Sequence, residues 1–215
     1  MSDIAQQLAK VAIIPIIVID DPANAIPLAR ALSDGGIPCA EITFRTATAA
    51  EALRCISGEF PDLLVGAGTV LTTEQATWAK AAGAKFIVSP GINPRVVDWC
   101  LTHDMPVYPG VCTPTDIDIA LNHGLRVVKF FPAEQIGGLA YLKAIAAPYG
   151  DIDFIPTGGV NATNLAAYLA FKRVLACGGT WMAPAEWIAQ QRFDKIGQEA
   201  RVASGIVRTA REQQA

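Results

Sequence analysis

The chain has 215 residues, 52% of them hydrophobic, and carries a formal net charge of -3. This length and composition allow a single α/β domain with a large core. The small, interspersed charge gives no indication of binding to nucleic acid or to an anionic membrane. Five cysteines without CxxC spacing predict neither a disulfide framework nor a metal site. The first residues lack the basic and apolar regions of a signal peptide, and no apolar run approaches membrane-spanning length, so we expect a cytoplasmic protein.

Short apolar segments alternate with amphipathic segments along the chain, which is the pattern of parallel strands joined by helices. Strands are predicted at residues 12–19, 38–44, 63–67, 84–88, 106–108, 126–131, 153–157 and 174–177. Helices are predicted between them, at about 20–33, 46–60, 72–83, 93–103, from 113, at 138–146, from 161 and in the last part of the chain. The helix that starts at Thr113 has a capping hydroxyl and a proline in its first turn.

Eight such units in one chain predict a single (β/α)8 TIM barrel over residues 1–215, with parallel strands and right-handed crossovers. A doubly wound open sheet is the alternative architecture. Glycine-rich ends on the seventh and eighth strands favour the barrel, because its phosphate site commonly lies there. The amphipathic segment before Ala12 would then form an N-terminal helix that caps the barrel floor.

Lys129 is a charged residue inside an apolar strand that ends at Pro132. Burying an ammonium group is unfavourable unless it is paired or loses its proton, and the neutral amine is a good nucleophile toward carbonyls. A salt-bridged or solvent-reaching lysine is the structural alternative. The other lysines fall on helical or polar stretches, or at the start of a strand in the case of Lys85. Only Lys129 lies near the carboxyl ends of strands, where the active sites of barrels are found.

Glu41 and Arg45 lie four residues apart in the second strand, so their side chains project to the same face. Glu41 could act as a general acid/base beside Lys129, or form a structural ion pair with it. Arg45 offers a forked set of donors to a carboxylate or phosphate, or could pair with a helix carboxylate at the surface. His103 and His123 both fall near helix C-termini, where a surface imidazole is the simplest interpretation.

The seventh and eighth strands both end in a Gly-Gly pair next to a threonine, at residues 157–159 and 178–180. Glycine lets the backbone approach an anion closely, and the free N–H groups of a following helix start can bind it. Tight turns between strand and helix need glycine in any case, but two such turns at neighbouring strands indicate a phosphate site. Neither a GxGxxG nor a Walker A pattern is present, so no dinucleotide or ATP is expected.

Six segments, which together span nearly the whole chain, carry a resemblance to a known family. They are EITFRT at 41–46, GAGTVL at 66–71, SPG at 89–91, VKFFPAE at 128–134, PTGG at 156–159 and GGT at 178–180. In this order they are similar to the motifs of the 2-keto-3-deoxy-6-phosphogluconate (KDPG) aldolases, also called 4-hydroxy-2-oxoglutarate (KHG) aldolases. The resemblance implies a metal-independent class I aldolase without a cofactor, which is a cytoplasmic homotrimer.

The same resemblance assigns expected roles to individual residues. Lys129 corresponds to the Schiff-base lysine and Glu41 to the acid/base carboxylate. The residues expected to bind the rest of the substrate are Arg45 and Thr69, on its pyruvyl part, with Pro90, Phe131 and Thr157. The expected phosphate ligands are Gly158, Gly159, Gly178, Gly179 and Thr180, where the family often has serine in place of Thr180.

The implied reaction is the cleavage of KDPG to pyruvate and glyceraldehyde 3-phosphate, with cleavage of KHG to pyruvate and glyoxylate as a second activity. A sister family that acts on the galactonate epimer lacks the pair found here as Arg45 and Thr46, which favours the gluconate-type substrate. Two alternatives stay open at this point. A phosphosugar epimerase or isomerase would use carboxylates or a metal, and a non-catalytic phosphosugar-binding protein would use Lys129 only to pair with its ligand.

Overall fold

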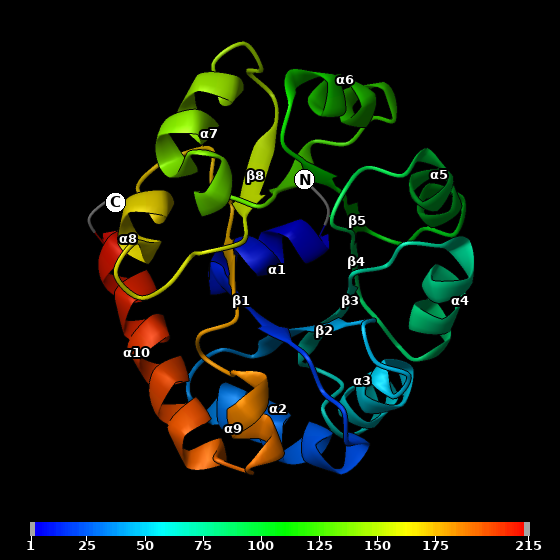
Figure 1. The fold of residues 1–215 in the computed structure, drawn as a ribbon, viewed down its shortest axis with the longest axis vertical. Coiled ribbons are helices and arrows are strands. Elements are labelled where there is room, and N and C mark those ends of the chain that lie inside the picture. The colour runs from blue at the N-terminus through cyan, green and yellow to red at the C-terminus, as the bar shows by residue number, and fades with distance from the viewer. Residues whose placement is uncertain (1–2, 213–215) are drawn as a thin grey trace.

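A ring of parallel strands surrounded by helices makes up the computed structural model, which describes residues 3–212 (Figure 1). The strands are β1 (Ile13–Ile17), β2 (Cys39–Thr43), β3 (Leu64–Gly68), β4 (Ile87–Val88), β5 (Val107–Tyr108), β6 (Gly110–Val111), β7 (Val127–Phe130), β8 (Asp153–Pro156) and β9 (Cys177–Gly179). They are short, and all but one of their residues are buried, as expected for strands covered on both faces.

The strands form two parallel sheets, with the orders β5-β4-β3-β2-β1-β9 and β6-β7-β8. Only Pro109 separates β5 from β6, and its carbonyl accepts a hydrogen bond of 2.9 Å from the backbone N–H of Lys129, so β5 and β6 occupy one strand position. Parallel bridges from Phe154 in β8 to Val174 and from Thr157 to Gly178 in β9 join the two strands through the residues that flank them. The described strands thus fill eight positions around a closed ring. The TIM-barrel prediction is confirmed, and the open-sheet alternative is excluded.

Helices cover the outside of the ring, and α10 packs against α2 and α8 (Figure 1). Their apolar stripes face the strands and their polar faces point outward. The helical elements are α1 (Asp3–Val11), η1 (Pro22–Asn24), α2 (Ala25–Asp34), α3 (Ala49–Glu59), α4 (Thr73–Ala81), α5 (Pro94–Thr102), α6 (Pro114–Asn122), η2 (Glu134–Ile136), α7 (Gly138–Ala146), α8 (Leu165–Leu169), α9 (Ala185–Ala189) and α10 (Phe193–Glu212).

Helix α1 lies across the barrel, as the sequence predicts for an N-terminal cap (Figure 1). Ala5 and Leu8 are buried, and the N–H of Ala12 donates to the carbonyl of Leu8 at 2.8 Å just before β1 begins. Because α1 leads directly into β1, it covers the amino-terminal end of the strands. The opposite end is left for the site.

Several predicted elements differ from the structure in their bounds, and two of these differences have a clear physical cause. The last strand is predicted at 174–177 from its apolar residues, yet β9 begins at Cys177 and includes Gly178 and Gly179, which pair with β1. Glycine has a weak strand preference, and closure of the barrel overrides it. The helix predicted from residue 161 begins only at Leu165, because side chains of the preceding segment take up the backbone N–H groups in a turn.

Candidate active site

The predicted site residues meet in one small cavity of about 90 Å³ at the carboxyl ends of the strands. Twelve were expected in the site, and all twelve line this cavity: Glu41, Arg45, Thr69, Pro90, Lys129, Phe131, Thr157, Gly158, Gly159, Gly178, Gly179 and Thr180. Ile16 and Val160 also line it and were missed, because an apolar residue at a strand end carries no chemical signal in the sequence. A larger cavity of about 560 Å³ lies at the amino-terminal ends of the strands and contains none of the twelve. The smaller cavity is therefore the one that gathers the expected site residues.

Lys129 and Glu41 form a close, buried pair of opposite charge. The Nζ atom of Lys129 lies 3.6 Å from Oε1 of Glu41, and the two residues are 6% and 2% exposed. The distance is too long for a hydrogen bond, and Oε1 accepts none within the described part of the chain. Lys129 Nζ also lies 5.2 Å from the centre of the Phe131 ring, close enough for a cation–π contact. A buried carboxylate oxygen without a hydrogen bond beside an amine is a suitable place for a third polar group.

Gly68 makes room for the Glu41 side chain. A Cβ atom at position 68 would lie 2.1 Å from Oε1 of Glu41 and 2.6 Å from its Cγ. Strands β2 and β3 pair in parallel with Thr43 opposite Gly68, so the glycine lies directly beside the strand that carries Glu41. A side chain here would displace the carboxylate from Lys129, so the glycine positions the pair.

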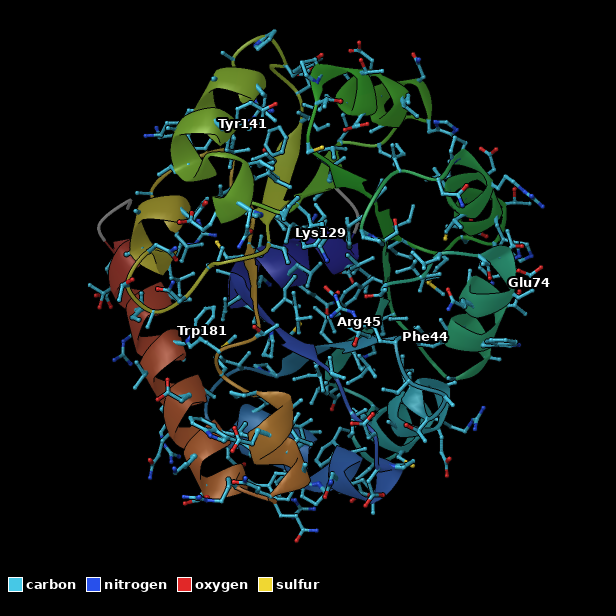
Figure 2. The ribbon with its side chains drawn as sticks, in the orientation of Figure 1. Phe44, Arg45, Glu74, Lys129, Tyr141 and Trp181 are labelled. Carbon is cyan, nitrogen blue, oxygen red and sulfur yellow. The ribbon has the colours of Figure 1, made fainter. Side chains whose placement is uncertain are left out.

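Arg45 follows β2 and lines the cavity, and it lies inside the ring of strands as Lys129 does, whereas Glu74 lies on α4 in the outer ring (Figure 2). The Arg45 side chain is exposed, and it makes no ion pair or hydrogen bond with the residues that the structure describes. The alternative of a surface arginine paired with a helix carboxylate therefore finds no support. A free guanidinium at this position can receive a carboxylate or a phosphate.

Thr69 is held in an unusual backbone conformation in the cavity wall. Its φ is +56°, in the left-handed region that a β-branched residue rarely adopts. Such a conformation costs on the order of 1–3 kcal/mol and is maintained by the surrounding structure. Strain of this kind is concentrated at sites of binding and catalysis, which fits the predicted role of Thr69.

The turn at residues 157–160 directs backbone N–H groups into the cavity. The carbonyls of Thr157 and Gly158 accept hydrogen bonds of 2.8 and 3.0 Å from the N–H groups of residues 133–134, which lie outside the cavity. In a trans peptide the C=O and the next N–H point in opposite directions, so the N–H groups of Gly158 and Gly159 face inward. Within the described residues neither they nor the N–H of Val160 donates a hydrogen bond. Such a row of free N–H groups is an anion-binding arrangement.

Positive φ angles of +99° and +79° at Gly158 and Gly159 form this turn. Side chains at these positions would be strained, and a Cβ at Gly159 would also lie 2.6 Å from the Cβ of Glu134. Glycine is therefore needed at both positions for the turn itself.

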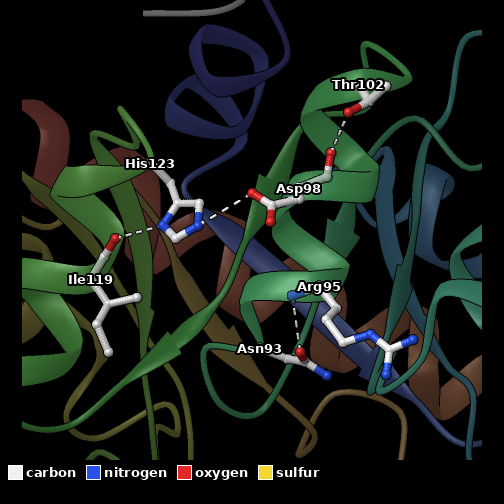
Figure 3. A network of polar contacts seen from close by, with 6 residues as sticks. All are labelled: Asn93, Arg95, Asp98, Thr102, Ile119 and His123. Carbon is white, nitrogen blue, oxygen red and sulfur yellow. Dashed lines mark hydrogen bonds and ion pairs between the residues drawn. The ribbon is translucent and has the colours of Figure 1, made fainter.

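Neither histidine lies in the cavity. His123, at the end of α6, places Nε2 3.3 Å from Oδ1 of Asp98 on α5, and its Nδ1 lies 2.8 Å from the carbonyl of Ile119 (Figure 3). The ring of His103 stacks on Trp99 with 4.1 Å between centroids. Both imidazoles are near helix C-termini, as predicted: His123 connects α6 to α5 on the outside of the barrel, whereas the His103 ring packs on its own helix, α5.

A family model described as "KDPG and KHG aldolase" matches residues 4–199 of the chain. This chain belongs to the KDPG and KHG aldolase family. The family prediction made from the six motifs is thus confirmed, and the epimerase and binding-protein alternatives are set aside.

Individual members of the aldolase family are similar over nearly their full lengths. The 2-dehydro-3-deoxy-phosphogluconate aldolase of Treponema pallidum (strain Nichols) is 54% identical over 196 residues, which cover 91% of this chain and 93% of that protein. A crystal structure of KDPG aldolase from Legionella pneumophila, with pyruvate captured at low pH as a covalent carbinolamine intermediate, has a TM-score of 0.90 and 37% identity, and covers 94% of this chain and 98% of that one. The KDPG aldolase of Zymomonas mobilis ZM4 with 3-phosphoglycerate has a TM-score of 0.86 and 39% identity, with 95% and 96% covered.

Proposed function

We propose that this chain is a class I aldolase that cleaves KDPG to pyruvate and glyceraldehyde 3-phosphate, and KHG to pyruvate and glyoxylate. The observation that carries the proposal is the buried Lys129–Glu41 pair inside the cavity at the carboxyl ends of the strands. The name of the Treponema relative supports the first substrate, and the description of the family supports the second. The covalent carbinolamine with pyruvate in the Legionella aldolase supports the amine chemistry.

Lys129 is the nucleophile in the proposed reaction. Its neutral amine attacks the C2 ketone, and loss of water from the resulting carbinolamine gives an iminium ion bonded to Nζ. The iminium accepts the electron pair of the C3–C4 bond when that bond breaks, which leaves an enamine on Lys129. Protonation of the enamine at C3 and hydrolysis of the imine release pyruvate and return the free amine.

Glu41 moves protons in this sequence. Its carboxylate removes the proton of the C4 hydroxyl as the C3–C4 bond breaks, so that the departing fragment leaves as an aldehyde. It also assists, directly or through a water molecule, in the proton transfers that convert the carbinolamine to the iminium. The 3.6 Å separation from Lys129 keeps the carboxylate beside the carbon atoms that react.

The two ends of the substrate are bound by different parts of the cavity. Arg45 and Thr69 bind the pyruvyl carboxylate, and Pro90, Phe131 and Thr157 form the walls around the chain of the substrate. The glycine turns bind the phosphate through backbone N–H groups, with the hydroxyl of Thr180 as an additional donor. Compared with the serine that the family often has, Thr180 adds a methyl group at the phosphate end of the cavity, which can alter the affinity for phosphate.

We further propose a single barrel domain over residues 1–215 that acts as a cytoplasmic homotrimer. The support for trimer and compartment is the family resemblance. No helix among the described residues is both long and apolar enough to cross a membrane. Analytical ultracentrifugation at micromolar concentration tests the assembly, and a monomeric mass would refute the trimer.

The test of the proposed function is borohydride trapping in the presence of pyruvate, followed by intact mass measurement and peptide mapping. We expect one reduced pyruvate adduct on Lys129, together with release of pyruvate from KDPG in a lactate dehydrogenase-coupled assay. A folded protein that gives no adduct at saturating pyruvate would contradict the Schiff-base mechanism. An adduct without KDPG cleavage would retain the mechanism and refute the substrate.

A further inference from the structure

The Gly159 carbonyl accepts hydrogen bonds from side chains, whereas the carbonyls of Thr157 and Gly158 accept them from backbone N–H groups. The Nδ2 atoms of Asn161 and Asn164 each donate to the Gly159 oxygen at 3.1 Å. We call these two amides the asparagine clamp. Because the clamp consists of side chains, a substitution can remove its hydrogen bonds to the turn. The bonds to the other two turn carbonyls come from the backbone and cannot be removed in this way.

The orientation of both amides is determined by their other hydrogen bonds. Oδ1 of Asn164 accepts from the backbone N–H of Asn161 at 2.8 Å, and Oδ1 of Asn161 accepts from the backbone N–H of Thr163 at 2.9 Å. A backbone N–H can bond only to the oxygen end of an amide. The NH2 ends of both side chains must therefore face Gly159, and the clamp cannot rotate without losing a second bond.

Holding the Gly159 carbonyl also sets the direction of the next N–H. Because C=O and N–H are opposed in a trans peptide, a carbonyl drawn toward the clamp turns the N–H of Val160 in the opposite direction. Val160 lines the cavity, and its N–H donates no hydrogen bond within the described residues. The clamp lies outside the cavity, so it acts on a bound anion only through this peptide.

We propose that Asn164, together with Asn161, is a positioning residue that fixes the Gly159–Val160 peptide for the phosphate of the substrate, and that it determines the preference for phosphorylated over unphosphorylated substrates. The inference rests on the proposed function, because it requires that the phosphate of KDPG occupies the 157–160 turn. KHG carries no phosphate, so its cleavage does not depend on the direction of the Val160 N–H. Lys129 and Glu41 lie on other strands and act equally on both substrates.

The decisive experiment compares steady-state kinetics on KDPG and KHG for the full-length protein and its Asn164→Ala variant. If the variant weakens one or two hydrogen bonds from the backbone N–H groups of the turn to the phosphate, KM for KDPG should rise about tenfold, with kcat little changed. KM and kcat for KHG should stay at the wild-type values. Inorganic phosphate, used as a competitive inhibitor of KDPG cleavage, should lose affinity by a similar factor. A purely structural defect would lower both activities together. The diagnostic quantity is therefore the ratio of kcat/KM for KDPG to kcat/KM for KHG, called the KDPG to KHG ratio below.

Two further variants make the test specific. Asn164→Asp keeps the acceptor for the N–H of Asn161 but replaces the NH2 group with an oxygen, so it should weaken KDPG binding at least as much as Asn164→Ala. Ala167→Asp adds the same charge on the exposed side of α8, one turn further on, and should leave the KDPG to KHG ratio unchanged. A fall of the ratio in Ala167→Asp would show that charge alone is responsible and would overturn the proposal.

The outcomes separate this inference from the proposed function. If the wild-type protein does not cleave KDPG, the proposed function fails, whatever the variants do. If the wild-type protein cleaves KDPG but Asn164→Ala keeps the KDPG to KHG ratio, the asparagine clamp has no role in specificity. Should Asn164→Ala melt at a much lower temperature, Asn161→Ala provides the same test, since it removes one of the two bonds to the Gly159 oxygen and leaves Asn164, the residue that precedes α8, in place. An unchanged ratio in that variant and in Asn164→Asp would overturn the inference.

Discussion

Lys129 on β7 and Glu41 on β2 approach within 3.6 Å across the interior of the barrel, although they belong to strands that are distant in sequence. The pair is nearly excluded from solvent, so the attraction between the charges is strong, yet the gap is wider than a hydrogen bond. A structural ion pair would be expected to close this gap and to satisfy the remaining lone pairs of the carboxylate. The open geometry fits two groups that work on a third.

Replacing Lys129 with methionine tests the nucleophile with a side chain of similar shape. We expect no borohydride adduct with pyruvate and no measurable cleavage of KDPG. The variant leaves Glu41 buried without its partner, so its free energy of unfolding in urea should fall by about 3 kcal/mol. Adding Glu41→Gln to Lys129→Met should recover most of this stability. Near-normal turnover by the single variant would eliminate the assignment of the nucleophile.

Glu41→Gln separates proton transfer from amine chemistry. The amide has the shape of the carboxylate but cannot accept the C4 hydroxyl proton, so we expect kcat for KDPG to fall by about 10²–10⁴-fold. The amine of Lys129 is still present, and borohydride should therefore trap pyruvate slowly at the same residue. Rapid quench followed by mass measurement gives both rates. Wild-type turnover in this variant would show that another group moves the protons.

Substitution of Thr69 should separate stability from activity. Thr69→Gly relieves the strain at φ +56°, and after the entropic cost of glycine we expect a gain of about 1 kcal/mol in the free energy of unfolding. Loss of the hydroxyl should raise KM for KDPG, because Thr69 is proposed to bind the pyruvyl carboxylate. The control is Thr69→Ala, which removes the hydroxyl but keeps a Cβ in the strained conformation. If both variants have equal stability in urea, the strain at Thr69 is insignificant.

The cysteines should differ widely in their reactivity toward iodoacetamide. Burial raises the pKa of Cys100 to about 12, and it raises the pKa values of Cys39 and Cys177 as well. Since the thiolate is the reactive form, a raised pKa leaves very little of it near neutral pH, and burial also blocks access. Peptide mapping of the native protein should therefore show alkylation first at Cys55 and then at Cys112, whose pKa is raised by partial burial and by Asp116.

In denaturant the same mapping should show all five cysteines alkylated. Alkylation of Cys39 in the native protein as fast as Cys55 would mean that β2 opens readily. Because Glu41 is carried by the same strand, such opening would also loosen the site.

Much of the fold follows from local patterns in the sequence. The alternation of apolar and amphipathic segments predicts parallel strands joined by helices, because a short apolar run suits a strand buried on both faces and an amphipathic run suits a helix buried on one. Lys129 stands out for a local reason as well, since a charge inside an apolar strand requires either a partner or a function. The motif order then identified the family, and the twelve expected site residues all line one cavity.

Other features depend on contacts between segments that are far apart in the chain. The packing of neighbouring strands and loops sets the 3.6 Å gap between Lys129 and Glu41 and the strain at Thr69. It also leaves the Arg45 guanidinium without an ion pair to any residue that the structure describes. The clamp formed by Asn161 and Asn164 was hidden because asparagine in a turn is ordinary in sequence, and only the position of the Gly159 carbonyl gives it a role.

The sequence by itself therefore determined the family and the barrel, and it predicted which residues would gather in one cavity. Only the tertiary structure decided the distances between them and the directions of their hydrogen-bonding groups. The physical reason is that periodicity and residue type express local burial, whereas the closure of eight strand positions into a ring is a property of the whole chain. Closure brings β2 beside β3 and opposite β7, and it pulls Gly178 and Gly179 into β9 against their own preference.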